Sequence, residues 1–300
     1  MSASAPRPLV RAERRGPSLV LTLDHPPVNV LSRPVLEELS SRLREANSDP
    51  AVRVVVLNSA AEKAFAAGAD IREMAPLGPA EARAHGARGQ AVTRLIERLP
   101  LPVIAAVHGV CLGGGCEIAL ACDFVFATPD AQFGQPEINL GVTPGWGGSQ
   151  RLPRRIGAAR ARRWIYTGRS VSAAEAHADG WVDRIVPRTE LLPSALEFAE
   201  ELAGKPPLAL AAAKYEILRA QDPRIDEDLR YELGLWARLF GSRDQREGMT
   251  AFLEKRPLPP RDRSDWEAQS HGFPWAEPTG SDRPTPPGGK RKRDEVSGPL

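Results

Sequence analysis

Two glutamates beside glycines or proline are the residues of this sequence best suited to acid–base chemistry. Glu117 follows the glycines Gly113 to Gly115, between an apolar run that predicts a buried strand and a short predicted helix. Amides at the start of a helix carry partial positive charge, so this turn could hold an anion or a developing oxyanion. Glu117 could equally complement the helix dipole. Glu137 follows Pro136 in a non-repetitive segment, where a surface turn is the simpler interpretation.

Two further segments combine small residues with positions where a ligand could approach the backbone. The first is FAAGADI, residues 65–71, in which the amides around Gly68 and Ala69 could point outward. A tight strand-to-helix connection capped by Asp70 is the alternative. The second is GVTPGWGG, residues 141–148, which either exposes amides to a ligand or forms a flexible surface loop. Taken separately, each segment favours a structural role.

Motifs of several other enzyme classes are missing from the sequence. Ile118 stands where the dinucleotide-binding GxGxxG motif needs its last glycine, and no GK[ST] follows as in a P-loop. The five histidines lack metal-binding spacing, and neither HExxH nor GxSxG occurs. Three cysteines without a CxxC pair argue against a disulfide scaffold and a cysteine zinc site. A serine hydrolase or zinc enzyme is therefore disfavoured, and the cysteine usage indicates a reducing cytoplasm.

The elements that would position these segments are strands and helices in alternation, followed by helices. A Gly16-Pro17 turn predicts a hairpin, and a capping box that joins Ser172 to Glu175 predicts a helix start. The predicted strands are 9–13, 18–23, 52–57, 102–107, 123–127 and 181–186. Predicted helices begin at Pro34 and cover 79–99, 117–121, 190–202, 208–220, 226–240 and 243–254. This order predicts an α/β core followed by a helical segment.

Length and charge narrow the function classes further. The 300 residues suit one large domain or two ordinary ones, and no apolar run reaches the ~18 residues of a membrane helix. A net charge of +2 excludes a strongly basic nucleic-acid binder overall. Residues 1–8 read as a disordered lead without a secretory signal, and the proline-rich residues 256–300 as a disordered tail. The KRKR run at 290–293 is a solvated tail or, less simply, a nucleic-acid or localisation patch.

Taken together and in order, the motifs resemble one family. FAAGADIREM, AAVHGVCLGGGCEIALACDFVFA, FGQPEINLGVTPGWGGSQRLPRRIG and the C-terminal REGMTAFLEKR are similar to segments of the enoyl-CoA hydratase/isomerase (crotonase) family, over residues 9–256. The resemblance implies an α/β fold: a crotonase (ClpP-like) spiral of ββα units over residues 9–190, then a helical trimerisation segment over 191–255. It also implies a hexamer built as a dimer of trimers, and an acyl-CoA thioester substrate, with no further cofactor, metal or membrane.

The resemblance also assigns the reacting groups. Glu117 and Glu137 would hold one water at the β-carbon, and the amides of Ala69 and Gly114 would form the oxyanion hole. Because two bare anions so close repel, the pair should share a proton. We expect Glu117 to be ionised and to activate the water, and Glu137 to deliver a proton to the α-carbon. Both glutamates favour an enoyl-CoA hydratase over a 3,2-enoyl-CoA isomerase; a methylglutaconyl-CoA-type hydratase stays open, and a nucleic-acid-binding homologue is a minor alternative.

The remaining expected contacts concern CoA and the acyl chain. Trp146, at a position where small residues are common in the family, should narrow the acyl pocket and favour short or branched chains. Arginine at position 72 replaces the lysine common in relatives, which keeps the charge but changes the donor geometry. The residues expected along CoA are Ala67, Gly68, Asp70, Ile71 and Arg72, joined by Phe252 and Lys255 of the last helix, sometimes reaching a neighbouring subunit's CoA.

Overall fold

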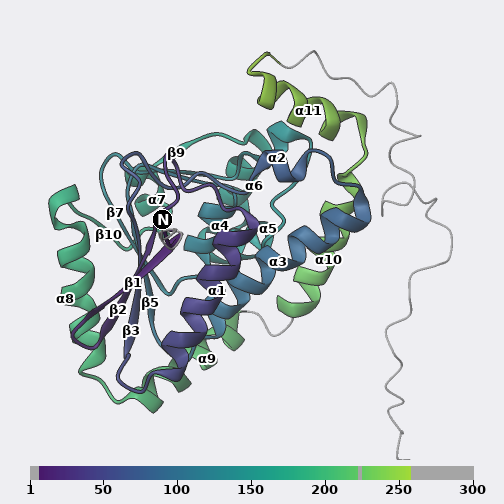
Figure 1. Ribbon diagram of the computed structural model, residues 1–300. Coiled ribbons are helices and arrows are strands. Elements are labelled where there is room, and N and C mark those ends of the chain that lie inside the picture. The colour runs from purple at the N-terminus through teal and green to yellow at the C-terminus, as the bar shows by residue number, and fades with distance from the viewer. Residues whose placement is uncertain (1–6, 222–224, 258–300) are drawn as a thin grey trace, which may run out of the picture. The chain divides into compact units, whose positions relative to one another are not determined.

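The computed structural model describes residues 7–221 and 225–257 (Figure 1). All of these belong to one unit of the chain, residues 1–260. Most of the predicted lead, and the predicted tail from residue 258 onward with its KRKR run, lie outside the described residues.

The main sheet has six strands in the order β1-β2-β3-β5-β7-β10. The predicted hairpin forms its antiparallel edge, and every other pair is parallel. The predicted strand 181–186 is shortened to two residues. The strands are β1 (Val10–Arg15), β2 (Ser18–Leu23), β3 (Val54–Ser59), β5 (Val103–Val107), β7 (Phe124–Ala127) and β10 (Arg184–Ile185).

Both faces of this sheet are covered, which explains why its central strands are almost continuously apolar. Side chains alternate along a strand, so Val54 and Val56 of β3 pack against α8 (Leu191–Ala203). Val55 and Leu57 point to the opposite face and join the larger core. Figure 1 shows α8 on one side of the strands and α1 (Arg33–Ser48) on the other.

A second sheet of four strands lies within the larger core, in the order β4-β6-β8-β9. Its strands are β4 (Ala64–Ala66), β6 (Val110–Leu112), β8 (Gln132–Gly134) and β9 (Val171–Ser172). The first three are parallel, and β9 is antiparallel to β8. The first three each follow a strand of the main sheet and precede helical structure, which confirms the expected spiral of ββα units, whereas β9 follows a helix (Ala158–Thr167). None of the strands predicted from the sequence corresponds to these four.

Helices fill the connections after the short strands. Pro79 occupies the first turn of α3, where a missing N–H costs nothing, and Ser172 caps α7 by accepting from the Glu175 N–H. The Glu175 carboxylate bonds Arg169, so only the serine half of the predicted capping box is seen. The helices are α2 (Ile71–Met74), α3 (Pro79–Arg98), α4 (Gly114–Leu120), η1 (Pro136–Leu140), α5 (Gly148–Ile156), α6 (Ala158–Thr167), α7 (Ala173–Ala178) and η2 (Arg188–Glu190).

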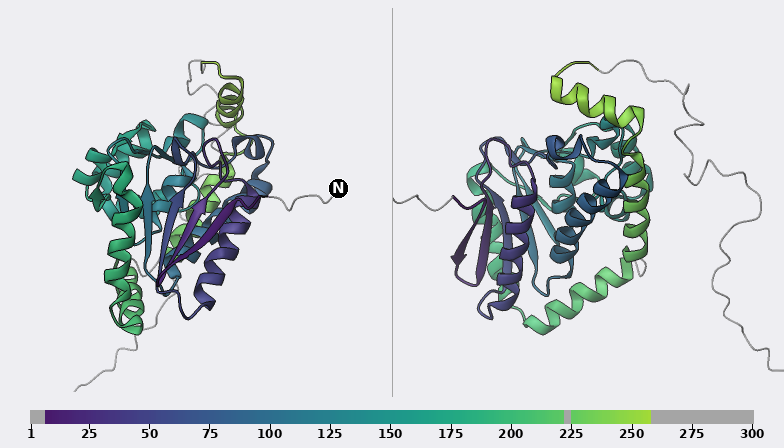
Figure 2. Two further views of the ribbon diagram at one scale, coloured as in Figure 1. Left: turned by 60° about the vertical axis from the view of Figure 1, so that its left-hand side comes forward. Right: turned by 45° about the vertical axis from the view of Figure 1, so that its right-hand side comes forward.

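The predicted C-terminal helices are all present. They are α8, α9 (Pro207–Gln221), α10 (Ile225–Leu239) and α11 (Arg243–Glu254). Figure 2 shows α9 running beneath the strands to α10, which lies along α3. The last helix, α11, contacts η1 and α2. None of the described helices is long and apolar enough to cross a membrane.

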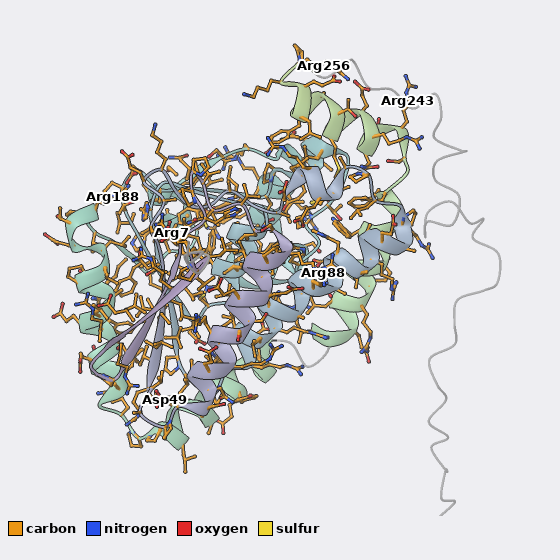
Figure 3. All side chains as sticks on the ribbon, viewed as in Figure 1. Arg7, Asp49, Arg88, Arg188, Arg243 and Arg256 are labelled. Atoms are coloured by element: carbon orange, nitrogen blue, oxygen red, sulfur yellow. The ribbon has the colours of Figure 1, made fainter. Side chains whose placement is uncertain are left out.

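Polar contacts fasten segments that are distant in the sequence, and two of the arginines that make them are labelled in Figure 3. Arg7 pairs with the buried Asp24 at 2.6 Å and so ties the start of the described chain to the end of β2. Arg188 donates to the carbonyl of Glu62 at 2.6 Å. These contacts hold the connections between elements against the two sheets.

Candidate active site

Three connections that carry predicted site residues leave the same end of the second sheet. Ala69 follows β4, Gly114 follows β6 and Glu137 follows β8. These strands are parallel neighbours, so their carboxyl ends meet at one edge. The three connections therefore lie side by side in the same order as in the sequence.

Two glycines with positive φ let the first two connections touch. Gly68 has φ 101° and Gly113 has φ 52°, both in the region that glycine tolerates best. A Cβ on Gly68 would lie 3.2 Å from the carbonyl oxygen of Leu112 and 3.7 Å from the nitrogen of Gly114. The backbones therefore approach at a distance that larger residues would prevent.

The amides of Ala69 and Gly114 lie at this contact. Leu31 donates its N–H to the carbonyl of Gly68 at 2.9 Å, which fixes the turn without using the Ala69 N–H. Gly114 is the first residue of α4, so its N–H has no carbonyl partner inside the helix. Two donors on adjacent backbone turns suit an oxygen that gains negative charge.

The predicted residues surround a small cavity of about 60 Å³. Residues from the first three of the four family motifs meet there. Its lining includes Ala67, Gly68, Ala69, Ile71, Gly114, Glu117, Glu137 and Trp146. A larger cavity of about 540 Å³ lies against α9. It lacks both glutamates of the predicted pair, and its Lys214 bonds Asp123 at 2.7 Å, so we place the chemistry at the smaller cavity.

Glu117 is buried and held by the glycine-rich segment. Its side chain is 2% exposed, so it does not simply face solvent beside the helix dipole. Its Oε1 accepts the N–H groups of Trp146 and Gly148, each at 2.7 Å. Two charge-assisted hydrogen bonds of this length favour the ionised carboxylate. Segment 145–148 is likewise buried, so the flexible surface loop was the wrong alternative.

Glu137 faces the same cavity from η1. A Cβ on Gly113 would lie 3.0 Å from Oε1 of Glu137, which places this carboxyl beside the turn that precedes α4. The residue is only partly exposed, so the surface-turn interpretation was also wrong. The buried Gln135 lies beside it. In the amide orientation that gives both groups a partner, its Nε2 donates to the two carboxyl oxygens at 3.1 and 3.2 Å.

Burial shifts the protonation of both carboxyls. Loss of hydration raises the pKa of Glu137 to about 8, and the charge of Glu232 adds to this. Loss of hydration also raises the pKa of Glu117 well above its usual range, followed by repulsion from Glu137 and Glu232, while the two amides lower it. Burial thus opposes the ionised state of Glu117, while the two 2.7 Å donors to its Oε1 favour it.

Aromatic residues close the cavity. Trp146 is 2% exposed, and its ring lies between Gly89 of α3 and Gly114, where an added Cβ would come within 2.2 and 2.3 Å of the ring, respectively. Trp236 of α10 also lines the cavity and was missed in the sequence. His85 lies between the two indoles, with ring centroids 6.1 and 6.3 Å away.

The residues expected along CoA are more dispersed. Asp70 caps α2 by accepting the Arg72 N–H at 2.9 Å, which is the structural role considered for it, and Arg72 is exposed beside it. Phe252 is 59% exposed at the end of α11, and Lys255 follows with φ 55°. Within the described chain, neither of these two is among the residues that line the cavity.

Comparison with known proteins agrees with this geometry. The model of the enoyl-CoA hydratase/isomerase family matches residues 15–263. A crotonyl-CoA hydratase of Syntrophomonas wolfei is 44% identical, with 79% of this chain and 92% of the relative aligned. A short-chain-enoyl-CoA hydratase of Clostridium acetobutylicum is 41% identical, with 82% and 95% aligned.

Solved structures show the same likeness. An enoyl-CoA hydratase from Bacillus anthracis superposes with a TM-score of 0.68 at 37% identity, covering 84% of this chain and 98% of the other. One from Mycobacterium avium subsp. paratuberculosis superposes with a TM-score of 0.76 at 29% identity, covering 86% and 100%.

Proposed function

This chain belongs to the enoyl-CoA hydratase/isomerase family, and on that basis we propose that it is an enoyl-CoA hydratase. It adds water reversibly to a trans-2-enoyl-CoA and gives a 3-hydroxyacyl-CoA. The observation that carries the proposal is that Glu117 and Glu137 line one cavity together with Ala69 and Gly114. An acid–base pair and a pair of amides are what the addition requires, without a cofactor or metal.

The amides act on the thioester. Its carbonyl oxygen lies between the N–H groups of Ala69 and Gly114, which polarise the conjugated double bond. When a nucleophile adds at the β-carbon, the electron pair of the double bond moves onto this oxygen as an enolate. Preorganised donors stabilise that charge, and losing one such donor costs about 3–4 kcal/mol in other enzymes.

The two carboxyls complete the addition of water. Glu117 takes a proton from the water as its oxygen bonds to the β-carbon. Glu137 then gives its proton to the α-carbon as the enolate collapses. The product has gained one water, and the proton on Glu117 returns to Glu137 to reset the pair. A 3,2-enoyl-CoA isomerase needs one carboxylate at the substrate, so a pair at one cavity favours hydration.

The aromatic closure favours a short or branched acyl chain. Trp146 and Trp236 both line the cavity, and each packs where an added Cβ on a facing glycine would clash. A long straight chain would have to displace at least one indole ring. The names of the two curated relatives, crotonyl-CoA hydratase and short-chain-enoyl-CoA hydratase, support the same class of substrate.

Assembly completes the proposal. Phe252 is exposed on α11, a helix that contacts η1 and therefore lies near Glu137. We assign Phe252 and Lys255 to the CoA of a neighbouring subunit in a hexamer, and Arg72 to the adenine end of CoA in its own subunit. The proposed location is the cytoplasm, supported by the unpaired cysteines.

Hydration of crotonyl-CoA, followed by loss of the enoyl-thioester absorbance, tests the activity. We expect Glu117→Gln and Glu137→Gln each to lower kcat by about 10²–10⁴-fold, because each removes one proton transfer. Glu197→Gln, an exposed glutamate on α8, is the matched control and should keep full rate. An inactive wild-type protein that is folded and assembled would overturn the proposal.

Chain length is tested separately with enoyl-CoAs of four and ten carbons. Trp146→Ala should raise the ratio of kcat/KM for the longer over the shorter substrate by about tenfold or more. A ratio unchanged in a folded variant would show that this indole does not limit the acyl chain.

A further inference from the structure

A third buried carboxyl lies close to the proposed catalytic pair, on the C-terminal helix α10. Glu232 is 4% exposed, although it belongs to a helix whose neighbouring Tyr231 is 58% exposed. Its Oε1 accepts the N–H of Gly147 at 2.7 Å and the side-chain amide of Gln90 at 3.2 Å. Its Oε2 accepts the hydroxyl of Ser149 at 2.5 Å. Each carboxyl oxygen therefore has a partner.

Three consecutive amides of the glycine-rich segment are shared between two carboxyls. Trp146 and Gly148 donate to Glu117, and Gly147 between them donates to Glu232. This alternation uses the left-handed backbone at Gly147, whose φ is 108°. The segment is thus held from both sides, by α4 and by α10.

We propose that Glu232 is a positioning residue for the hydration reaction: it anchors segment 145–148, which in turn orients Glu117. The inference rests on the proposed function for its kinetic part, but the anchoring itself is a property of the chain. It gives α10 a role in catalysis in addition to packing.

The charged groups around Glu232 explain why its carboxyl can be ionised although it is buried. Arg151 of α5 lowers the pKa of Glu232 by its charge and itself donates from Nε and Nη2 to the two carboxyl oxygens of Glu97 on α3. Glu117 of α4 and Glu137 of η1 face the same region, and the charge of Glu232 raises the pKa of each. With burial as the largest cause, the pKa of Glu232 is about 7. Its charge is therefore present above neutral pH.

Two variants separate the effect of the hydrogen-bond acceptors of Glu232 from the effect of its negative charge. Glu232→Gln keeps an oxygen for Gly147 and places an amide against the Ser149 hydroxyl, which can accept. Glu232→Ala removes every acceptor and leaves the segment free to shift. We expect Glu232→Ala to lower kcat roughly 100-fold while KM stays within about threefold, because misplacement of the catalytic group affects the transition state more than binding. Glu232→Gln should stay within about fivefold of the wild-type kcat at its pH optimum.

Leu233→Ala is the matched control for simple loss of packing. Leu233 is the next residue of α10, is 7% exposed and lies in the cluster around Met74 and Phe240. It should lower the thermal midpoint at least as much as Glu232→Ala but leave kcat within about threefold of wild type. Equal losses of kcat in both variants would overturn the proposal.

Hydrogen exchange tests the anchoring without reference to activity. The amides of 146–148 should exchange at least about tenfold faster in Glu232→Ala than in wild type, since Gly147 loses its acceptor. Glu232→Gln and Leu233→Ala should exchange as wild type. If the wild-type protein hydrates no enoyl-CoA, the proposed function fails, but hydrogen exchange still tests whether Glu232 anchors segment 145–148. Unchanged exchange in Glu232→Ala would refute the anchoring.

The pH dependence of kcat shows whether Glu232 acts on the proposed general acid, Glu137, or has only a structural role. The charge of Glu232 raises the pKa of Glu137 and of Glu117. Removing it in Glu232→Gln lets Glu137 lose its proton more easily, so the alkaline limb of kcat should move to lower pH. The limb should not move in Leu233→Ala. An unmoved limb in Glu232→Gln would show that Glu232 does not face the reacting carboxyls.

Discussion

The raised pKa of Glu137 means that the proposed general acid destabilises the fold at alkaline pH. Its pKa is about 8 in the folded protein against an ordinary value of 4.5. Between these values the folded state binds a proton that the unfolded state has released. Stability therefore falls as pH rises from 4.5 to 8 and is constant above 8. A glutamine at position 137 does not titrate, so it causes no such loss of stability as the pH rises.

The magnitude follows from the shift. About 3.5 pH units, at 1.36 kcal/mol each, correspond to about 5 kcal/mol at pH 9 and to about 1 kcal/mol at pH 5. Because Glu137 keeps a partial opening to solvent, 5 kcal/mol is an upper limit. Glu137→Gln should thus be more stable than wild type at pH 9 although it has lost activity, as expected where function and stability compete.

Thermal unfolding at pH 5 and pH 9 measures this difference. At about 2–4 °C per kcal/mol, the advantage of Glu137→Gln in Tm should grow by up to about 8–15 °C between the two pH values. Glu197→Gln, on the exposed side of α8, should show no such growth. If the difference between Glu137→Gln and wild type is the same at both pH values, Glu137 does not hold a proton in the folded protein near neutrality.

Two further substitutions test the packing around the cavities. Gly114→Ala would bring a Cβ within 2.3 Å of the Trp146 ring, so it should lower stability by about 1–3 kcal/mol in thermal unfolding and abolish most hydration of crotonyl-CoA. Gly234→Ala is the control and should keep its activity, because the nearest atom to its added Cβ is Nη1 of Arg83 at 3.9 Å. Lys214→Met would leave the part-buried Asp123 without its ion-pair partner. Since the Asp123 side chain is 24% exposed, the cost should be below the about 3–5 kcal/mol of a fully buried pair. The double variant with Asp123→Asn should recover part of the lost Tm, and no loss in the single variant would contradict the importance of this pair.

Long periodic elements were predictable because hydrophobic spacing is a local property. The helix that begins near Pro34 and the buried strand that contains Val54 follow from it directly. Strands β4, β6 and β8 have three residues each, too few to show a period, so they were missed. Their pairing partners lie 22 to 46 residues away in sequence.

Site residues that lie within a distinctive sequence motif could be predicted, whereas those that only the fold brings to the site could not. Glu117 and Glu137 each lie in a distinctive motif. Glu232 is a single acid on a helix with many charged residues, 85 positions from the amide that it binds, and nothing local distinguishes it from a solvated residue. Trp236 likewise reads as an ordinary core residue of an amphipathic helix. Burial and long-range contact, which identify both, are properties of the folded chain.

The parallel arrangement of β4 and β6 determines how far apart the two amides can be. Neighbouring strands lie about 4.8 Å apart, and an oxygen that accepts two N–H bonds of about 2.9 Å can span at most about 5.8 Å between the nitrogens. Donors that leave adjacent strands at the same edge therefore fit one oxygen atom, whereas donors two strands apart would not. A substitution in either turn alters the direction of a donor, while the separation stays set by backbone pairing. The width of the proposed oxyanion hole is in this sense a dimension of the sheet and does not depend on any side chain.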